Sequence, residues 1–179
     1  MNIFSDPQKI IDSLEIFPGQ QVADLGSGSG AYSLLVAEKI QANKDSRIFA
    51  VDIQKDLLSR ISSEAKSRHL DSLHIIWGDI EQEKGTRLRH DSIDTALIIN
   101  TLFQVDHNKN VIQEAHRILK PGGRVIVIDW MDSFGNIGPK QNEVVTQKTA
   151  ELLCEEVGFK KERLFDAGEH HYGFISHKI

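Results

Sequence analysis

Short apolar runs alternate along this chain with stretches whose apolar residues recur every three or four positions. The runs are apolar on both faces, as parallel strands are when helices cover each side of a sheet. They occupy residues 21–25, 47–51, 73–77, 93–99 and 124–129, followed by two further strands at 159–165 and 172–176. The alternation predicts an α/β fold built on a doubly wound, mostly parallel sheet.

Helical periodicity fills the intervals between these strands, at residues 30–40, 54–68, 110–119 and 142–157. One more helix is predicted to start at Ser5-Asp6-Pro7, because a capping residue followed by proline is typical of a helix N-terminus, and to end at Pro18-Gly19. The helix predicted at residues 110–119 stops at Lys120-Pro-Gly-Gly123. No repeat or linker divides the chain, so we expect one domain over residues 1–179.

Composition narrows the class of protein. The 179 residues, 40% hydrophobic and 26% charged, are typical of a globular domain. A formal net charge of −5 disfavours nucleic acid as a partner. No apolar stretch approaches the ~18 residues of a membrane span, and the first residues lack a signal-peptide pattern, so we expect a cytoplasmic protein. The single cysteine, Cys154, excludes an internal disulfide, and its amphipathic surroundings favour a buried packing thiol.

The most informative segment is Val22-Ala-Asp-Leu-Gly-Ser-Gly-Ser-Gly30, where an apolar strand runs into three alternate glycines. Glycine permits positive φ and close approach of a ligand, and the following helix offers unpaired N–H groups to an anionic group. Gly26, Gly28 and Ala31 also satisfy the fingerprint of dinucleotide sites, with Asp52 near the spacing of a ribose-binding acid. The turn alone therefore predicts a small, partly charged ligand without deciding which one.

Four landmarks occur in order: the acidic glycine turn from Asp24 to Gly30, Asp52 at the end of the second strand, Gly78-Asp79-Ile80, and the corner Arg117-Ile-Leu-Lys-Pro-Gly-Gly-Arg-Val125. Together they resemble the class I S-adenosylmethionine (SAM)-dependent methyltransferases, in the branch related to ubiquinone and menaquinone biosynthesis enzymes. The resemblance spans residues 17–175 and implies a Rossmann-like three-layer sandwich of seven strands, ordered 3-2-1-4-5-7-6 with the last strand antiparallel. A nicotinamide dehydrogenase is the competing reading of the glycine turn, but such enzymes usually need further chain for a substrate pocket.

The resemblance implies SAM as cofactor and S-adenosylhomocysteine as product. We expect Asp52 to accept hydrogen bonds from the ribose hydroxyls, Asp79 to accept from the adenine amino group, and Asp24 to order the amino acid end. Asn100 and Thr101 either adjoin the methyl donor or only cap their strand. As alternatives to ligand binding, Asp79 is only an aspartate that favours the turn, and Asp52 is only a solvated acid before a helix. The predicted cofactor-binding residues are Asp24, Gly26, Ser27, Gly28, Gly30, Asp52, Ile53, Asp79, Ile80, Asn100 and Thr101.

Methyl transfer needs a base only when the acceptor must lose a proton. The segment Asn100-Thr-Leu-Phe-Gln104 lacks the signature of amino-methylating DNA enzymes, and Gln104 stands where relatives often have histidine, so no catalytic residue is assigned. Asp106 and His107 are the nearest titratable groups.

The acceptor pocket is expected at the ends of the fourth and fifth strands. Its predicted walls are Asn100, Phe103, Trp130 and one or more of His170, His171 and Tyr172, with packing in the interior as the alternative for Trp130. No metal site is predicted, because adjacent histidines on a strand point to opposite faces.

The sequence therefore predicts SAM-dependent methyl transfer to a small-molecule acceptor by a monomer or homodimer. The alternatives are an RNA or protein methyltransferase, and a nucleotide-binding scaffold without catalysis.

Overall fold

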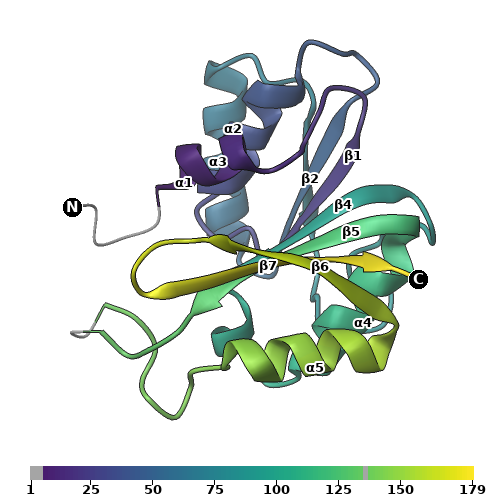
Figure 1. Cartoon of the computed structure of the whole chain (residues 1–179). Helices are drawn as coiled ribbons and strands as arrows, with labels where there is room; N and C mark the ends of the chain where they lie inside the picture. The colour runs from purple at the N-terminus through teal and green to yellow at the C-terminus, as the bar shows by residue number, and fades with distance from the viewer. Residues whose placement is uncertain (1–5, 135–136) are drawn as a thin grey trace.

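The computed structural model describes residues 6–134 and 137–179. Strands and helices alternate through most of the chain, as the hydrophobic pattern predicts (Figure 1). The elements are α1 (Pro7–Ser13), β1 (Gln21–Leu25), α2 (Ala31–Ile40), β2 (Arg47–Asp52), α3 (Lys55–Ser67), β3 (Leu73–Trp77), β4 (Ile93–Ile99), the 3₁₀ helix η1 (Leu102–Gln104), α4 (Asn108–Ile118), β5 (Leu119–Trp130), α5 (Gln147–Val157), β6 (Phe159–Asp166) and β7 (His171–Lys178).

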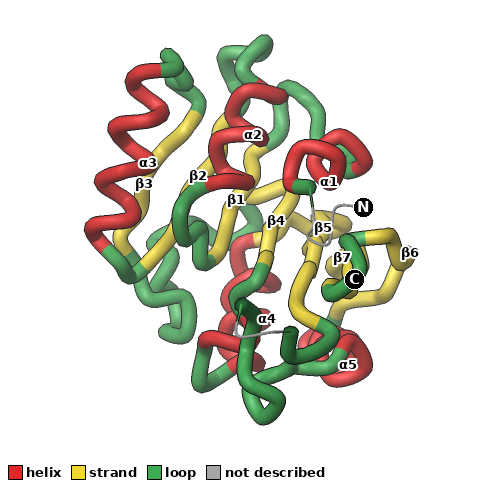
Figure 2. Tube along the Cα trace, turned by 90° about the vertical axis from the view of Figure 1, so that its left-hand side faces the viewer, coloured by secondary structure: helices red, strands yellow, loops and turns green. Residues whose placement is uncertain are grey.

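The seven strands form one sheet in the order β3-β2-β1-β4-β5-β7-β6 (Figure 2). β1 pairs in parallel with β2 and β4, whereas β7 is antiparallel to both β5 and β6. The predicted fold class and strand order are confirmed. Because the order reverses between β1 and β4, the carboxyl ends of these two strands border a crevice of the kind in which open α/β sheets bind ligands.

Two helical layers cover the sheet. The core on one face joins α1 and α2 to residues such as Val22 and Ile126, and the core on the other face joins α4 and α5 to residues such as Ala23 and Val127. In Figure 1, α1, α2 and α3 accordingly lie on one side of the strands and α4 and α5 on the other. Neighbouring strand residues thus enter different cores, which explains why the central strands are mostly apolar.

Local sequence signals account for several helix ends. The Asp6 carboxylate accepts hydrogen bonds from the backbone N–H groups of Gln8 and Lys9, and Pro7 follows it in the first turn. Asp6 is therefore the N-cap of α1, while Ser5 lies outside the described residues. At the other end of the chain, Gly158 closes α5 with φ +105°, a left-handed conformation that suits glycine.

The predicted start of the last helix at Asn142 is wrong, because α5 begins at Gln147. Thr146 has an extended backbone, and its hydroxyl accepts a 3.2 Å hydrogen bond from the Thr149 N–H, which defines the N-cap. The helical spacing of the residues before Thr146 does not decide their conformation. Val144 is instead half-buried in an irregular segment.

The predicted end of the first helix at Pro18-Gly19 is also wrong, because α1 ends at Ser13 and Leu14 already has an extended backbone.

Boundaries of later elements differ from the prediction as well. Helix α4 begins at Asn108 rather than residue 110, and β5 begins at Leu119 rather than Arg124. Leu119 already pairs with Ile93, and the register shifts before Arg124 pairs with Thr95. The Pro-Gly-Gly corner is therefore an irregularity inside the strand, with Gly122 at φ +75°, and not a separator between elements.

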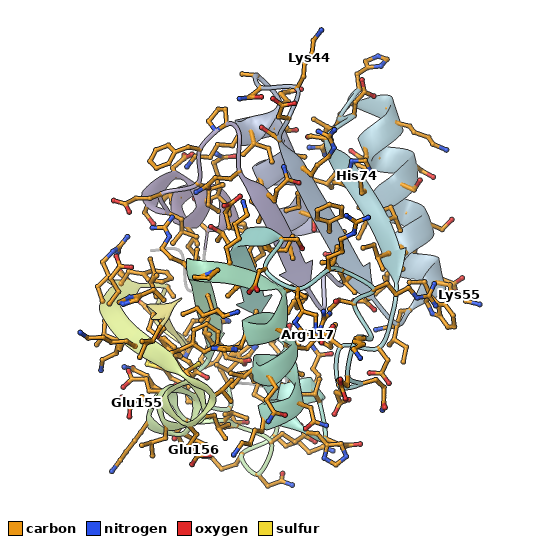
Figure 3. All side chains as sticks on the ribbon, turned by 90° about the vertical axis from the view of Figure 1, so that its right-hand side faces the viewer. Lys44, Lys55, His74, Arg117, Glu155 and Glu156 are labelled. Carbon is orange, nitrogen blue, oxygen red and sulfur yellow. The ribbon has the colours of Figure 1, made fainter. Side chains whose placement is uncertain are left out.

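The charged exterior fits a globular protein. Lys44, Lys55, Glu155 and Glu156 are exposed and project from the edges of the molecule (Figure 3). None of the helices in the described ranges combines the length and hydrophobicity that crossing a membrane requires.

Candidate functional site

The glycine turn joins the end of β1 to the start of α2. Gly26 has φ +80°, and a Cβ on this residue would lie 2.8 Å from the Thr101 side chain, so only glycine fits there. Gly28, at φ +52°, has a different environment, since the nearest atom to an added Cβ would be 4.0 Å away. The turn is thus packed against the segment after β4 at Gly26 and open at Gly28.

Asp52 connects this turn to the end of β2. Its Oδ2 accepts a 2.8 Å hydrogen bond from the Gly28 N–H, and its Oδ1 accepts a 2.8 Å hydrogen bond from the Gln54 N–H. The residue is only 6% exposed. A carboxylate has about four acceptor positions, so Asp52 keeps lone pairs for a ligand while it orders the backbone on both sides.

The chain leaving β3 supplies the next part of the site. Asp79 Oδ1 accepts a 3.0 Å hydrogen bond from the Glu81 N–H, which closes a tight turn around Ile80. A Cβ on Gly78 would lie 2.2 Å from the Gly85 carbonyl oxygen, so the loop 78–85 can fold back on itself only with glycine at position 78.

The segment after β4 forms the opposite wall. Thr101 is 4% exposed, and its hydroxyl lies within hydrogen-bond distance of the carbonyl oxygens of Leu25 (3.2 Å) and Ile99 (3.0 Å). Asn100 adopts φ +52°, and its N–H donates to the Ile128 carbonyl. The buried Asn100 Oδ1 has no hydrogen-bond partner within the described part of the chain.

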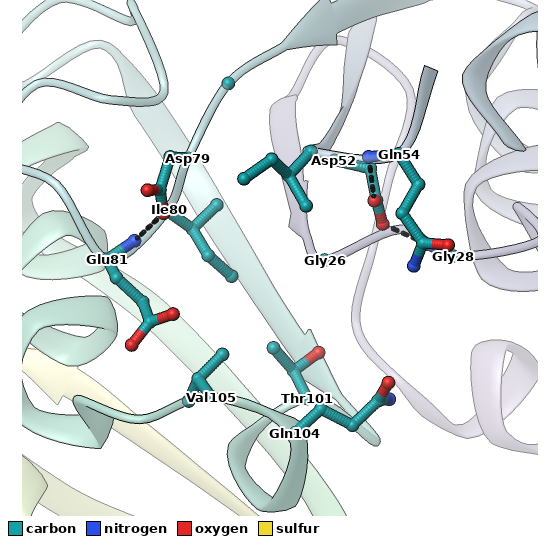
Figure 4. A pocket seen from close by; sticks show the side chains of 12 residues that line it. Gly26, Gly28, Asp52, Gln54, Asp79, Ile80, Glu81, Thr101, Gln104 and Val105 are labelled. Carbon is teal, nitrogen blue, oxygen red and sulfur yellow. Dashed lines mark hydrogen bonds between the residues drawn. The ribbon is translucent and has the colours of Figure 1, made fainter. Parts of the chain in front are cut away.

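These four segments enclose one cavity of about 200 Å³ at the carboxyl ends of β1, β2, β3 and β4 (Figure 4). Figure 4 shows Asp52 and Gln54 on one side, Asp79, Ile80 and Glu81 on another, and Thr101, Gln104 and Val105 below them. The lining residues are Gly26, Gly28, Asp52, Ile53, Gln54, Gly78, Asp79, Ile80, Glu81, Thr101, Gln104 and Val105.

Seven of the predicted cofactor-binding residues therefore line this cavity: Gly26, Gly28, Asp52, Ile53, Asp79, Ile80 and Thr101. Four others do not line it: Asp24, Ser27, Gly30 and Asn100. Gly30 faces the core instead, since a Cβ there would lie 2.5 Å from Ile61. The part that each of these residues plays in binding stays a prediction.

The predicted cofactor-binding set lacks five lining residues: Gln54, Gly78, Glu81, Gln104 and Val105. Gln54 and Glu81 each follow a predicted residue by one or two positions, and their backbone N–H groups bind the Asp52 and Asp79 carboxylates. The sequence signal for them is therefore an acid at the end of a strand, followed by a turn.

Asp24 lies behind the cavity wall with 3% exposure, where Ser33 Oγ donates a 2.5 Å hydrogen bond to its Oδ2. Burial raises the pKa of Asp24 to about 6, the Ser33 hydrogen bond lowers it, and the charge of Asp52 raises it. Two carboxylates thus lie near each other on neighbouring strands, which favours positive charge close to the glycine turn.

The predicted acceptor wall is not assembled as expected. Tyr172 is 2% exposed and belongs to the core that contains Ala150 and Cys154 of α5, so its assignment as a pocket wall is wrong. Trp130 is 7% exposed and lies 4.3 Å from His171, ring centroid to ring centroid, with Gly138 against its indole. Of the two interpretations of Trp130, the structure supports interior packing.

His170 contacts the chain that leaves β5. Its Nδ1 is 3.0 Å from each Asp132 carboxylate oxygen, and its ring stacks on Phe134. The contact ties the β6–β7 turn to the chain leaving β5. In the described ranges, no three His, Cys, Asp or Glu side chains gather as a metal-binding group.

Cys154 is 1% exposed, and burial raises the pKa of its thiol to about 12. The predicted packing role is confirmed, since a thiol in this environment is not an available nucleophile.

The strand order and the cavity at the switch point define a class I methyltransferase-like fold, and comparison with known proteins identifies the family. Residues 16–169 match the family model described as a methyltransferase domain. The chain belongs to this family, the class I SAM-dependent methyltransferases, as its sequence landmarks predict.

Among curated proteins, the chain is 28% identical over 148 residues to a ubiquinone/menaquinone biosynthesis C-methyltransferase of Methylococcus capsulatus. The match covers 80% of this chain and 56% of that protein. The chain thus spans about half the length of curated relatives that it matches.

Solved structures with the same fold differ in their described activities. A SAM-dependent methyltransferase from Aquifex aeolicus superposes with a TM-score of 0.86 at 19% identity, covering 98% of this chain and 91% of that one. The [4+2]-cyclase SpnF superposes with a TM-score of 0.79 at 14% identity, covering 96% of this chain and 80% of that one. At these identities the likeness shows the fold alone, and the reaction must be argued from the site.

Proposed function

We propose that this chain binds SAM in the cavity between β1, β2, β3 and β4 and transfers the methyl group to a small-molecule acceptor. The observation that carries the proposal is the charge of the cavity: among the lining residues, the ionisable groups are Asp52, Asp79 and Glu81, all of them acids. A lining of carboxylates favours a ligand with positive charge, as in the sulfonium and ammonium groups of SAM, over the anionic pyrophosphate of a dinucleotide.

The residues present also fit the neutral parts of SAM. Asp52 offers spare carboxylate lone pairs to a ribose diol, since each oxygen carries one backbone hydrogen bond. Asp79 would accept from the adenine amino group, with the buried Ile80 beside it as an apolar contact. Gly28 leaves open space where a side chain would obstruct the ligand.

When bound, SAM supplies an electrophilic methyl carbon, and the chain's residues hold it in position for in-line displacement. Positioning and exclusion of water carry much of such a reaction. Gln104 lines the cavity with an amide that does not titrate, so it cannot remove a proton from the acceptor. If the acceptor must lose a proton, the proton therefore goes to one of the lining carboxylates or to a group outside the cavity lining.

A small molecule is the proposed acceptor class for two reasons. The curated relative acts in ubiquinone and menaquinone biosynthesis by its name, and the net charge of −5 weakens attraction to a phosphate backbone. A cytoplasmic location and a monomeric or homodimeric state remain predictions.

Titration calorimetry tests the cofactor. We expect one site per chain for SAM and for S-adenosylhomocysteine, and no heat with NAD. NAD binding without a response to either sulfur compound would overturn the proposal. Turnover with a panel of quinols, phenols and amines then tests the acceptor class. Tight SAM binding with no turnover would favour a scaffold, and a salt-sensitive RNA complex with methylated RNA would favour an RNA methyltransferase.

A further inference from the structure

The 3₁₀ helix η1 lacks a side-chain cap of its own. Thr101 occupies the N-cap position, yet its side chain makes no hydrogen bond to the helix. The hydroxyl lies instead against the carbonyl oxygens of Leu25 and Ile99, which are accepting groups. The first N–H groups of η1 therefore need an acceptor from elsewhere in the fold.

Asp129, near the end of the neighbouring strand β5, supplies that acceptor. Its Oδ2 accepts a 2.8 Å hydrogen bond from the Leu102 N–H, and its Oδ1 accepts a 2.8 Å hydrogen bond from the Trp130 N–H. The backbone N–H groups of Thr101 and Phe103 also favour the ionised form of this carboxylate. Asp129 is 1% exposed, so these contacts form in the interior, where an unpaired N–H is costly.

The segment that Asp129 caps is a wall of the cofactor cavity. Thr101, Gln104 and Val105 all line the cavity. Thr101 also packs on Gly26, where an added Cβ would lie 2.8 Å from it, so a shift of η1 would displace the glycine turn as well. Asp129 itself is not among the lining residues.

We propose that Asp129 is a positioning residue, which caps η1 from the adjacent strand and thereby holds the β4 side of the cofactor cavity in its binding geometry. The proposal rests on the proposed function in one respect, namely that the cavity holds the cofactor. If Asp129 only stabilised the sheet, its substitution would loosen β4 and β5 as a whole. If it positions η1, its substitution loosens η1 selectively.

Asp129 is also the group whose protonation would loosen this contact. Burial raises its pKa to about 6, against the opposing effect of its backbone donors. Tyr172 faces it from β7, with Cys154 and Glu151 of α5 beyond the tyrosine. Burial raises the pKa of Tyr172 and of Cys154 far above neutrality, so neither titrates near pH 6. Glu151 has a lowered pKa and is already ionised there.

The test compares Asp129→Asn with Asp94→Asn. Asp94 is a matched control, because it also accepts a backbone hydrogen bond, from the Gln21 N–H at 2.8 Å, but lies at the opposite end of β4. In the ligand-free protein, we expect Asp129→Asn to speed amide exchange at Leu102 and Phe103 by about tenfold, while Asp94→Asn leaves both unchanged. The affinity for S-adenosylhomocysteine should fall by about tenfold in Asp129→Asn alone, and in turnover KM for SAM should rise more than kcat falls.

Unchanged exchange at Leu102 and Phe103 in folded Asp129→Asn would overturn the proposal, and so would equal acceleration throughout β4 and β5. If this variant does not fold, a titration of the wild-type protein decides. The amide resonances of Leu102 and Trp130 should then shift together with a midpoint of about 6, and the absence of a shared transition would refute the assignment. If the wild type binds no SAM, the proposed function fails while the exchange experiment still tests Asp129.

Discussion

The Gly28 N–H donates a 2.8 Å hydrogen bond to the Asp52 carboxylate, which joins the glycine turn after β1 to the end of β2. The same carboxylate accepts from the Gln54 N–H at the start of α3. Asp52 therefore organises the protein side of the cavity before any ligand arrives. Its role in the site has two parts, one toward the backbone and one toward a ribose.

Replacing Asp52 by Ala should remove both parts. We expect the affinity for S-adenosylhomocysteine to fall about thirtyfold, or ~2 kcal/mol, because charge-assisted hydrogen bonds are lost. Calorimetry measures the change. Asp56→Ala is the control, since Asp56 is an exposed acid in the first turn of α3, outside the cavity lining. Wild-type affinity in folded Asp52→Ala would exclude this residue from the site.

Gly26→Ala should lower stability more than Gly122→Ala does. Both glycines have positive φ, +80° and +75°, so alanine strains each backbone by a similar amount. Only Gly26 has a neighbour in the way, since an added Cβ would meet Thr101 at 2.8 Å, whereas none lies within 4 Å at Gly122. We expect losses in the free energy of unfolding of about 3 and about 1 kcal/mol, respectively.

Urea denaturation of the two variants gives the comparison. The clash also predicts weaker S-adenosylhomocysteine binding for Gly26→Ala alone. Equal losses of stability would mean that Thr101 moves aside without cost, and the close packing at Gly26 would then have no consequence.

Much of the fold is predictable from the sequence because buried parallel strands have a strong local signature. The bounds of β1, β3 and β4 are those that the apolar runs predict. The start of α5 is different: the residues before Thr146 have helical spacing, but the extended backbone and the hydroxyl cap of Thr146 make the helix begin at Gln147. The early start of β5 likewise depends on pairing between Leu119 and Ile93, which are far apart in the chain.

The residues of the site also divide into those that the sequence predicts and those that it does not. Asp52 and Asp79 could be placed at one edge because parallel strands end together, and both line the cavity. Gln104 and Val105 could not be placed from the sequence. They reach the cavity because of the course of η1, which Asp129 caps from another strand. The predicted place of Tyr172 in the acceptor wall is wrong, because the alternation along β7 does not tell which face of the sheet α5 covers.

Tyr172→Phe should accordingly leave methyl transfer and cofactor affinity unchanged. The Tyr172 hydroxyl is buried, and no group in the described ranges forms a hydrogen bond with it. Removing an unpaired buried hydroxyl relieves a desolvation penalty, so we expect the free energy of unfolding to stay the same or to rise by about 1 kcal/mol. Thermal denaturation together with calorimetry measures both quantities. A large loss of turnover with unaltered stability would restore Tyr172 to the acceptor site.

Asp24 predicts an unusual dependence of stability on pH. Burial raises its pKa from 3.8 to about 6, so between these values the folded state binds more protons than the unfolded state. The contribution of Asp24 to the free energy of unfolding therefore falls as the pH rises from about 4 to about 6 and is level above that range. Asn cannot ionise, so the stability of wild type relative to Asp24→Asn should fall by about 3 kcal/mol across this window.

Urea denaturation of both proteins at intervals from pH 4 to pH 7 tests this expectation. Asp129, whose pKa is also raised to about 6, is present in both proteins and cancels in the difference. Ser33→Ala provides a second check, because loss of the hydrogen bond to Asp24 should raise the pKa of Asp24 further and extend the decline to higher pH. Parallel curves for wild type and Asp24→Asn over the whole range would show that Asp24 stays ionised in the folded protein.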